Sequence, residues 1–246
     1  MNNLVINKLC IEVTRKCNMK CLHCMRGEPQ KIEVSLNIID ELFNNNNFTI
    51  KEIKELVITG GEPTLNVKAL LKIIREIIEN KIIIKSFNMV INGSNYSKKI
   101  IDSLNLLHNY GVSIINLICS LDQYHNPPKN EILNKYYLLS YFKANYRHLS
   151  NNDIICIGRA YKNKLGKIET YYINELICYD FIKNNYPNIS FSNNGDILLD
   201  ELYLTSKGLY GFHIIDSTYD MLDKLCIYDN HELIKFICNN NIKRRS

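Results

Sequence analysis

Three cysteines near the start of the chain are the residues best suited to carry chemistry. Cys17, Cys21 and Cys24 are spaced Cys-x3-Cys-x2-Cys in the segment KCNMKCLHC. Thiolates are soft ligands that select iron–sulfur clusters, zinc or Cu(I). A structural zinc ion or an ordinary [4Fe–4S] cluster takes four protein ligands, so three cysteines leave one coordination position for a small molecule. The spacing therefore predicts a metal centre with an open site.

A second motif follows at the end of an apolar run that has the character of a strand. In ELVITGGEPTLN the run ends in Gly60, Gly61, Glu62 and Pro63. Glycines at a strand end permit close approaches that a Cβ atom would block. Taken alone, the motif is more typical of a strand–turn–helix connection, with Glu62 near the N-terminus of the following helix.

Together, and in this order, the two motifs resemble those of the radical S-adenosylmethionine (radical SAM) superfamily. The resemblance extends from about Cys10 to about Leu199. It implies that Cys17, Cys21 and Cys24 hold one [4Fe–4S] cluster, whose fourth iron binds S-adenosylmethionine. Reduction of the cluster by a flavodoxin- or ferredoxin-type donor would cleave this cofactor to a 5′-deoxyadenosyl radical. The radical would then abstract a hydrogen atom from a substrate.

The resemblance also implies a role for the glycine motif in binding S-adenosylmethionine. The backbone carbonyls of Gly60 and Gly61 would accept hydrogen bonds from its ammonium group. Glu62 would place a carboxylate beside that charge, and Pro63 would stiffen the turn. His23, just before the third cysteine, would lie near the adenine, or alternatively would be a fourth metal ligand.

Polar residues at other predicted strand ends are further candidates by this resemblance. Asn92 and Ser120 would bind the ribose hydroxyls, and Arg159 would pair with the cofactor carboxylate, which arginine can bind in a bidentate manner. For Asn92 and Ser120, the alternative is that they simply end their strands. In SLDQYHNPP, Asp122, Tyr124 and His125 would face the substrate; alternatively, Tyr124 belongs to the core and His125 is a solvated turn residue. The catalytic residues stay unassigned.

An alternation of apolar strands and helical patterns must position these residues. We expect strands at 9–14, 55–59, 86–92, 115–121 and 153–158, and helices after Ser35 and at 67–79, 97–108 and 130–144. Near-continuous apolar strands indicate a parallel sheet that is buried on both faces. Asn193-Asn194-Gly195 has the signature of a hairpin turn. The pattern and the resemblance together predict an α/β fold, a partial, open (β/α)6 barrel with a short C-terminal extension.

The domain organisation follows from the same pattern. We expect a core over residues 1–200 and an extension over residues 201–246 that contains one helix, HELIKFICN. The extension has no Cys-x2-Cys, so we expect no auxiliary cluster there. Cys10, Cys119 and Cys156 are expected to pack inside strands as small apolar residues.

Bulk properties exclude several classes of protein. No run approaches the roughly 18 apolar residues that span a bilayer, and the N-terminus has no signal-peptide pattern, so we expect a cytoplasmic protein with no membrane partner. The net charge of +5 comes without a long basic stripe, so a nucleic-acid partner is not expected.

These observations favour a radical SAM enzyme with a single cluster. A peptide or protein side chain is the first expected substrate, and a small metabolite or nucleotide is the second. Activation of a glycyl-radical partner is the third, although the cysteine segment lacks the extended N-terminal signature of that group. A different class also stays open: a metal-binding or electron-transfer module without radical chemistry.

Overall fold

The computed structural model describes residues 2–166, 189–210 and 218–219 of the chain. The strands are β1 (Asn2–Thr14), β2 (Phe48–Gly60), β3 (Ile83–Ile91), β4 (Ile114–Leu121), β5 (Phe142–Tyr146), β6 (Ile189–Phe191), β7 (Ile197–Thr205) and β8 (Gly208–Tyr210). The helices are α1 (Leu36–Phe43), α2 (Val67–Glu79), α3 (Lys98–Tyr110), α4 (Asn130–Tyr137) and α5 (Gly158–Lys162), with a 3-10 turn, η1 (Pro63–Leu65).

One sheet organises the described residues. Its strand order is β5-β4-β3-β2-β1-β7-β6, with β8 paired to β7. The pairs from β5 to β7 along this order are parallel, and the two pairs that β7 makes with β6 and β8 are antiparallel. Strands β5 and β6 lie at opposite edges, so the sheet is open. The expected α/β class and open parallel sheet are therefore confirmed.

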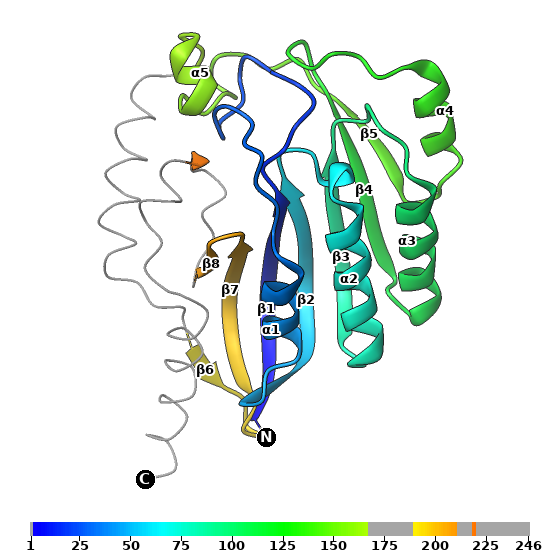
Figure 1. The fold of residues 1–246 in the computed structure, drawn as a ribbon, viewed down its shortest axis with the longest axis vertical. Coiled ribbons are helices and arrows are strands. Elements are labelled where there is room, and N and C mark those ends of the chain that lie inside the picture. The colour runs from blue at the N-terminus through cyan, green and yellow to red at the C-terminus, as the bar shows by residue number, and fades with distance from the viewer. Residues whose placement is uncertain (1, 167–188, 211–217, 220–246) are drawn as a thin grey trace.

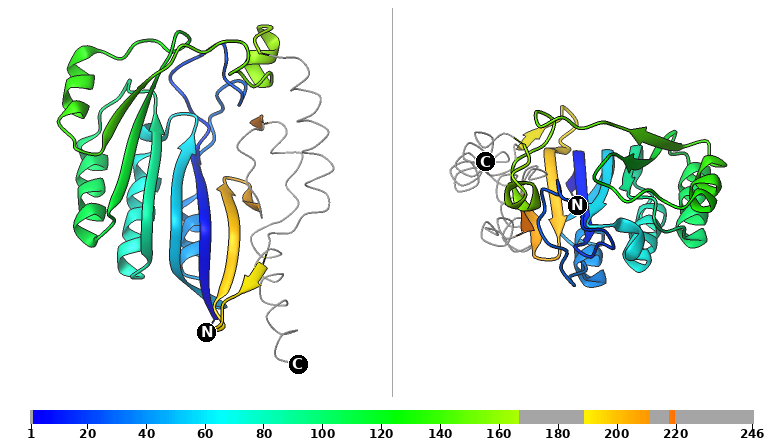
Figure 2. Two further views of the ribbon diagram at one scale, coloured as in Figure 1. Left: turned by 180° about the vertical axis from the view of Figure 1, so that it is seen from behind. Right: turned by 90° about the horizontal axis from the view of Figure 1, so that it is seen from above.

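The expected burial of both faces holds for the central strand β1, whereas in β2, β3 and β4 buried residues alternate with exposed or partly exposed ones. In β1, Leu4, Ile6, Leu9 and Ile11 are all fully buried, although successive side chains point to opposite faces. Helices α1, α2 and α3 lie along one face of the sheet (Figures 1 and 2). These helices and strands share one hydrophobic core.

Local signals set the ends of the helices. Ser35 caps α1 as expected, since its side chain accepts a hydrogen bond from the backbone N–H of Asn37. Asn66 and Ser97 cap α2 and α3 in the same way. Gly111 ends α3 in the left-handed conformation, with φ at 112°.

Two expected elements are wrong. The helix expected at 130–144 ends at Tyr137, and its last part belongs to β5 instead. The strand expected at 153–158 does not form: this segment is a buried bend that leads into α5. The two errors share a physical cause. Strand β5 is a half-exposed edge strand without an apolar run, whereas 153–158 is apolar because Ile154, Cys156 and Ile157 pack inside.

The predicted hairpin is present, and it extends the sheet. Strands β6 and β7 pair across the turn at 192–196, and β7 lies parallel to β1. Residue 200, the expected domain boundary, falls within β7. The extension as a unit stays a prediction, because its expected helix HELIKFICN and Cys178, Cys226 and Cys238 lie outside the described residues. Within the described part of the chain, no helix is both long and apolar enough to cross a bilayer.

Cys10 and Cys119 lie buried in β1 and β4, as expected for small apolar residues. Cys156 is also buried, but in the bend before α5. Burial raises the pKa of Cys10 to about 12. Each of these thiols therefore packs as an uncharged side chain.

Candidate active site

The cysteine segment leaves the carboxyl end of β1 and crosses the top of the sheet in the view of Figure 1. The glycine motif lies directly beside its first residues. The N–H of Gly61 donates to the carbonyl of Thr14 at 2.7 Å, and the N–H of Glu62 donates to that of Lys16 at 2.8 Å. The two sequence motifs are thus physically joined at adjacent strand ends.

This contact explains why glycines stand at the end of β2. A Cβ atom on Gly60 would lie 2.3 Å from the carbonyl oxygen of Thr14. A Cβ atom on Gly61 would lie 2.3 Å from that of Lys16. Because both neighbours are backbone atoms, any side chain here would displace the cysteine segment. The expected contact of the two glycine carbonyls with an ammonium group stays a prediction.

A cavity of about 400 Å³ lies over these strand ends. Its walls include the three cysteines and most of the other candidate residues, namely Cys17, Cys21, Cys24, His23, Gly60, Gly61, Glu62, Asn92, Ser120 and Arg159. Pro63 is buried at the start of η1 and is not among the lining residues. The volume falls within the usual range of small-ligand sites.

The three thiols influence one another across this cavity. Burial, followed by the charges of Cys24 and Cys17, raises the pKa of Cys21 to about 11. Burial also raises the pKa of Cys17, although the N–H of Met19 donates to its Sγ atom at 3.4 Å. Thiols with raised pKa values stay protonated at neutral pH until a metal displaces the proton. Three thiols that line one cavity fit an iron–sulfur cluster.

Arg159 reaches the cavity by a different route from the one expected. It lies in α5 and does not end a fifth strand. Its backbone N–H donates to the carbonyl of Cys24 at 2.9 Å, and a Cβ atom on Gly158 would lie 2.3 Å from the carbonyl oxygen of Met25. The Arg159 side chain is buried, and its Nε and Nη1 atoms have no hydrogen-bond partner among the described residues. A buried guanidinium of this kind fits an anionic ligand such as a carboxylate.

Glu62 is occupied by bonds within the protein. Its Oε1 atom accepts the N–H of Thr64 at 3.1 Å, and its Oε2 atom accepts the N–H of Asn92 at 2.7 Å. Burial raises the pKa of this carboxyl group despite these bonds. Glu62 thus joins the ends of β2 and β3 and caps η1, which agrees with the alternative role near a helix N-terminus. A contact between Glu62 and a cofactor stays a prediction.

Asn92 directly follows β3, and Ser120 is the penultimate residue of β4, so both lie at strand ends as expected. The Nδ2 group of Asn92 donates to Asn18 in the cysteine segment at 2.9 Å, and its Oδ1 atom accepts the N–H of Ser94 at 3.0 Å. Ser120 is half-buried at the cavity wall. Both residues therefore border the cavity that the three cysteines line, and their contact with a ribose stays a prediction.

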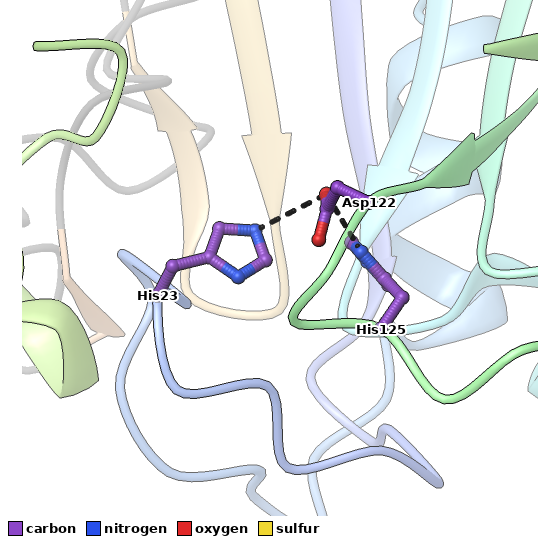
Figure 3. Close-up of side chains that lie close together, drawn as sticks. All are labelled: His23, Asp122 and His125. Carbon is purple, nitrogen blue, oxygen red and sulfur yellow. Dashed lines mark ion pairs between the residues drawn. The ribbon is translucent and has the colours of Figure 1, made fainter. Parts of the chain in front are cut away.

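His23 lies beside Asp122 and His125 from the loop after β4 (Figure 3). The Asp122 Oδ2 atom is 2.8 Å from His125 Nδ1 and 3.7 Å from His23 Nε2. Burial alone would raise the pKa of Asp122, but the adjacent His125 imidazole and the hydrogen bond from the N–H of Tyr124 outweigh it and hold the pKa below its usual value. His125 is therefore paired and mostly buried, which contradicts the alternative of a solvated turn residue.

A buried polar network holds the cysteine segment from below. Glu12 accepts the Nε–H of Arg15 at 2.8 Å and the hydroxyl of Tyr203 at 3.0 Å, and Arg26 donates to that hydroxyl at 3.1 Å. The Arg15 guanidinium lies 4.8 Å from the centre of the Tyr219 ring. The network joins β1, the cysteine segment and β7.

A second cavity, of about 730 Å³, adjoins the first. The two share His125 and Arg147, and the second also reaches Pro127, Tyr146 and His148. It lies between the loop after β4 and the end of β5. The arrangement provides a cofactor-sized space next to a larger one, with a histidine between them.

The sequence analysis did not predict a role at the site for several of these residues. Nothing local to Gly158 indicates its contact with the cysteine segment, since that contact depends on the tertiary fold. Glu12 does leave a signal, because it is a charged residue inside an otherwise apolar strand, CIEVT. A buried charge of this kind requires a partner, which here comes from Arg15 and Tyr203.

Comparison with known families gives a match to the description "Radical SAM superfamily" over residues 11–159. GTP 3′,8-cyclase of Campylobacter lari (strain RM2100 / D67 / ATCC BAA-1060) is 41% identical over 80 residues, which are 31% of this chain and 24% of that protein. GTP 3′,8-cyclase of Nautilia profundicola (strain ATCC BAA-1463 / DSM 18972 / AmH) is 38% identical over 63 residues, which are 24% of this chain and 20% of that protein. The matched segments thus span about a quarter or less of these relatives.

Two solved structures show weak overall similarity. SuiB of Streptococcus suis bound to the precursor peptide SuiA has 14% identity and a TM-score of 0.45, over 83% of this chain and 59% of that chain. The structure of anSMEcpe with bound AdoMet has 13% identity and a TM-score of 0.40, over 95% of this chain and 84% of that chain.

Proposed function

Because the chain belongs to the radical SAM superfamily, whose members use a [4Fe–4S] cluster and S-adenosylmethionine, we propose that it catalyses hydrogen abstraction from a second substrate. The reduced cluster, when bound, supplies the electron that cleaves S-adenosylmethionine to a 5′-deoxyadenosyl radical. One observation carries the proposal: the three cysteines, the glycine motif and the buried Arg159 line the same cavity, and the Nε and Nη1 atoms of Arg159 have no hydrogen-bond partner among the described residues.

Different residues would bind the cluster and S-adenosylmethionine. Cys17, Cys21 and Cys24 would hold the cluster, and the Arg159 guanidinium would pair with the cofactor carboxylate. His23 would lie against the adenine. Apolar walls that include Ile91, Ile154 and Ile155 would keep water from the reacting groups.

Asn92, Ser120 and the Gly60–Pro63 turn complete the proposed cofactor site. Asn92 and Ser120 lie where ribose hydroxyls would be bound, at the carboxyl ends of parallel strands. Glu62 would act through the turn, because both of its oxygens hold backbone N–H groups in place.

For the second substrate, we place a peptide or protein side chain first. The second cavity lies next to β5, whose outer edge pairs with no other strand among the described residues. Such an edge can accept an extended peptide by main-chain hydrogen bonds. Tyr146, at the end of this edge, is 68% exposed and borders the cavity.

A nucleotide is the second candidate. The curated relatives are named for a reaction of GTP, and the second cavity has two exposed basic residues, Arg147 and His148. Basic side chains suit phosphate groups. The relatives match over only 63 to 80 residues, however. So short a match supports the shared motifs more strongly than it supports a shared substrate.

The central test is the formation of 5′-deoxyadenosine. The purified protein is reconstituted with iron and sulfide under anaerobic conditions, reduced, and mixed with S-adenosylmethionine. We expect product from the native chain and none from a variant with Cys17→Ala, Cys21→Ala and Cys24→Ala. Product no higher than in this variant would contradict the proposal. A metal content of one zinc, without acid-labile sulfide, would favour the non-catalytic alternative.

Two further arms refine the test. Arg159→Gln should weaken the binding of S-adenosylmethionine by roughly 10- to 100-fold, the equivalent of one hydrogen-bonded charge pair. The exposed Arg75→Gln on α2 is the matched control. Adding GTP to the reaction separates the substrate classes: coupled loss of GTP would favour the nucleotide, and a mass change in a peptide encoded beside the gene would favour the peptide.

A further inference from the structure

A cluster of potential metal ligands that includes none of the three cysteines borders the first cavity. His23 belongs to the cysteine segment, whereas Asp122 and His125 come from the loop after β4 (Figure 3). One ligand atom from each of the three lies within 4.8 Å of the other two. The side chains of His23 and His125 are only 18% and 14% exposed, and that of Asp122 is fully buried. Burying a carboxylate costs free energy unless the group is paired, hydrogen-bonded or bound to a metal.

Hydrogen bonding accounts for only part of the cluster. His125 Nδ1 lies 2.8 Å from Asp122 Oδ2, but the two atoms are not oriented for a hydrogen bond, and neither has a hydrogen-bond partner among the described residues. His23 Nε2 is 3.7 Å from the same oxygen, which is too long for one. The other ring nitrogen of His23, Nδ1, is buried and has no hydrogen-bond partner in the described part of the chain. His23 is thus directed at a carboxylate to which it is not bonded.

The geometry points to a divalent transition-metal site formed by His23, Asp122 and His125, of the zinc-binding class. Zinc binds imidazole nitrogen and carboxylate oxygen at about 2.0–2.2 Å, so neighbouring ligand atoms in a tetrahedral site lie roughly 3.4 Å apart. The spacings of 2.8 and 3.7 Å fall on either side of this value. A metal ion would supply a partner for the facing atoms of His125 and Asp122, which have no hydrogen-bond partner among the described residues.

The surroundings of the cluster resemble those of a metal site. The backbone N–H of Tyr124 donates to the Oδ1 atom of Asp122 at 2.9 Å, which orients the carboxylate from behind. The charges of Arg147 and Arg159 also reach His23 and would oppose a cation. Arg147 is exposed and therefore screened, and Arg159 also acts on the thiols of Cys17 and Cys21.

Three protein ligands leave a fourth position open, as in catalytic zinc sites. His125 lines both cavities, so an external ligand for this position would come from one of them. The site would therefore lie between the proposed cofactor and its second substrate. The site does not rest on the proposed function: none of its three ligands would hold the cluster, and only His23 is shared with the proposed cofactor site.

The test uses Co²⁺ as the probe in the Cys17→Ala, Cys21→Ala, Cys24→Ala variant, from which the thiolate ligands have been removed. We expect one Co²⁺ per chain, with visible ligand-field absorption and no sulfur-to-cobalt charge-transfer band. Adding His125→Ala or Asp122→Asn should weaken binding by at least about tenfold. His108→Ala, in the last turn of α3, is the control and should leave binding unchanged. Binding that is absent, or that ignores His125→Ala and Asp122→Asn, would show a hydrogen-bonded cluster only.

A second measurement covers the case in which the triple variant does not fold. The full chain, reconstituted with iron and sulfide, is dialysed against Zn²⁺, and zinc and iron are counted together. We expect zinc beyond the iron–sulfur content, lost in His125→Ala while iron and sulfide stay unchanged. Zinc that survives this substitution would overturn the inference. Because iron content and 5′-deoxyadenosine are read separately, failure here is distinct from failure of the proposed function.

Discussion

At the scale of single residues, the closest constraint on the site is the contact between the glycine motif and the cysteine segment. Gly61 has no room for a Cβ atom, since the carbonyl of Lys16 would lie 2.3 Å away. The neighbouring atom belongs to the backbone, so it cannot rotate away as a side chain could. Cys17 directly follows Lys16, so its position depends on the absence of a side chain at Gly61.

We accordingly expect Gly61→Ala to lower the free energy of unfolding by about 1–3 kcal/mol, the usual cost of overpacking. It should also lower the iron content after reconstitution, because the cysteine segment must move. Urea denaturation and iron analysis measure the two effects. Gly111→Ala is the control. The φ of 112° at Gly111 makes a side chain there unfavourable, but a Cβ atom would contact nothing, and the residue lies at the end of α3. Equal iron loss in both variants would contradict this explanation.

At the scale of elements, β7 supports the cysteine segment from the far side of β1. Tyr203 in β7 is fully buried, and its hydroxyl lies between the carboxylate of Glu12 and the guanidinium of Arg26. Both charges depend on this hydroxyl for one of their hydrogen bonds. The hairpin that contains β7 is thus part of the framework of the site.

Tyr203→Phe removes that hydroxyl while keeping the ring. We expect it to lower the free energy of unfolding by about 1–3 kcal/mol, because two buried charged groups each lose a partner. Tyr141→Phe is the matched control, since the Tyr141 hydroxyl bonds to Asn105 at an exposed position. Its effect should stay within about 0.5 kcal/mol. Chemical denaturation of both variants measures the difference, and equal losses would argue against a supporting role for the network.

At the scale of the whole molecule, polar and charged contacts join three strands at the end of the sheet opposite the site. Asp196, in the turn between β6 and β7, accepts hydrogen bonds from Lys51 in β2 at 2.9 Å and from Asn3 in β1 at 3.0 Å. These contacts bring together segments that are far apart in the sequence. They attach the hairpin to the first two strands.

Those two hydrogen bonds, the one from Lys51 first, lower the pKa of Asp196 below its ordinary value of 3.8. A depressed pKa contributes stability above the ordinary value, and the contribution is lost as the pH falls through the depressed one. Asp196→Asn should therefore destabilise the protein near neutral pH, by an amount that shrinks as the pH falls below 3.8.

Urea denaturation of both proteins across this range measures the effect. Asp102→Asn, at an exposed pair with Lys98 on α3, is the control and should change stability little. A difference between the native chain and Asp196→Asn that stays constant down to acid pH would rule out this account.

Much of the site could be predicted from local sequence, because its chemistry depends on short spacings. The Cys-x3-Cys-x2-Cys spacing keeps three thiols within reach of one centre, and a strand followed by two glycines marks a close approach. The apolar runs likewise predicted the open parallel sheet. The errors fell on segments in which burial and strand formation do not coincide. Residues 153–158 are mostly apolar and buried but form a bend, and β5 is a strand without an apolar run.

By itself, then, the sequence determined the ligand chemistry and the alternation of strands and helices, since both are local properties of the chain. Only the tertiary structure decided which distant residues meet. It placed β7 beside β1, brought Arg159 to the cavity on a helix, and set His23 against Asp122 and His125. The physical reason is that strand order and loop packing are set by the whole core. No short segment contains that information.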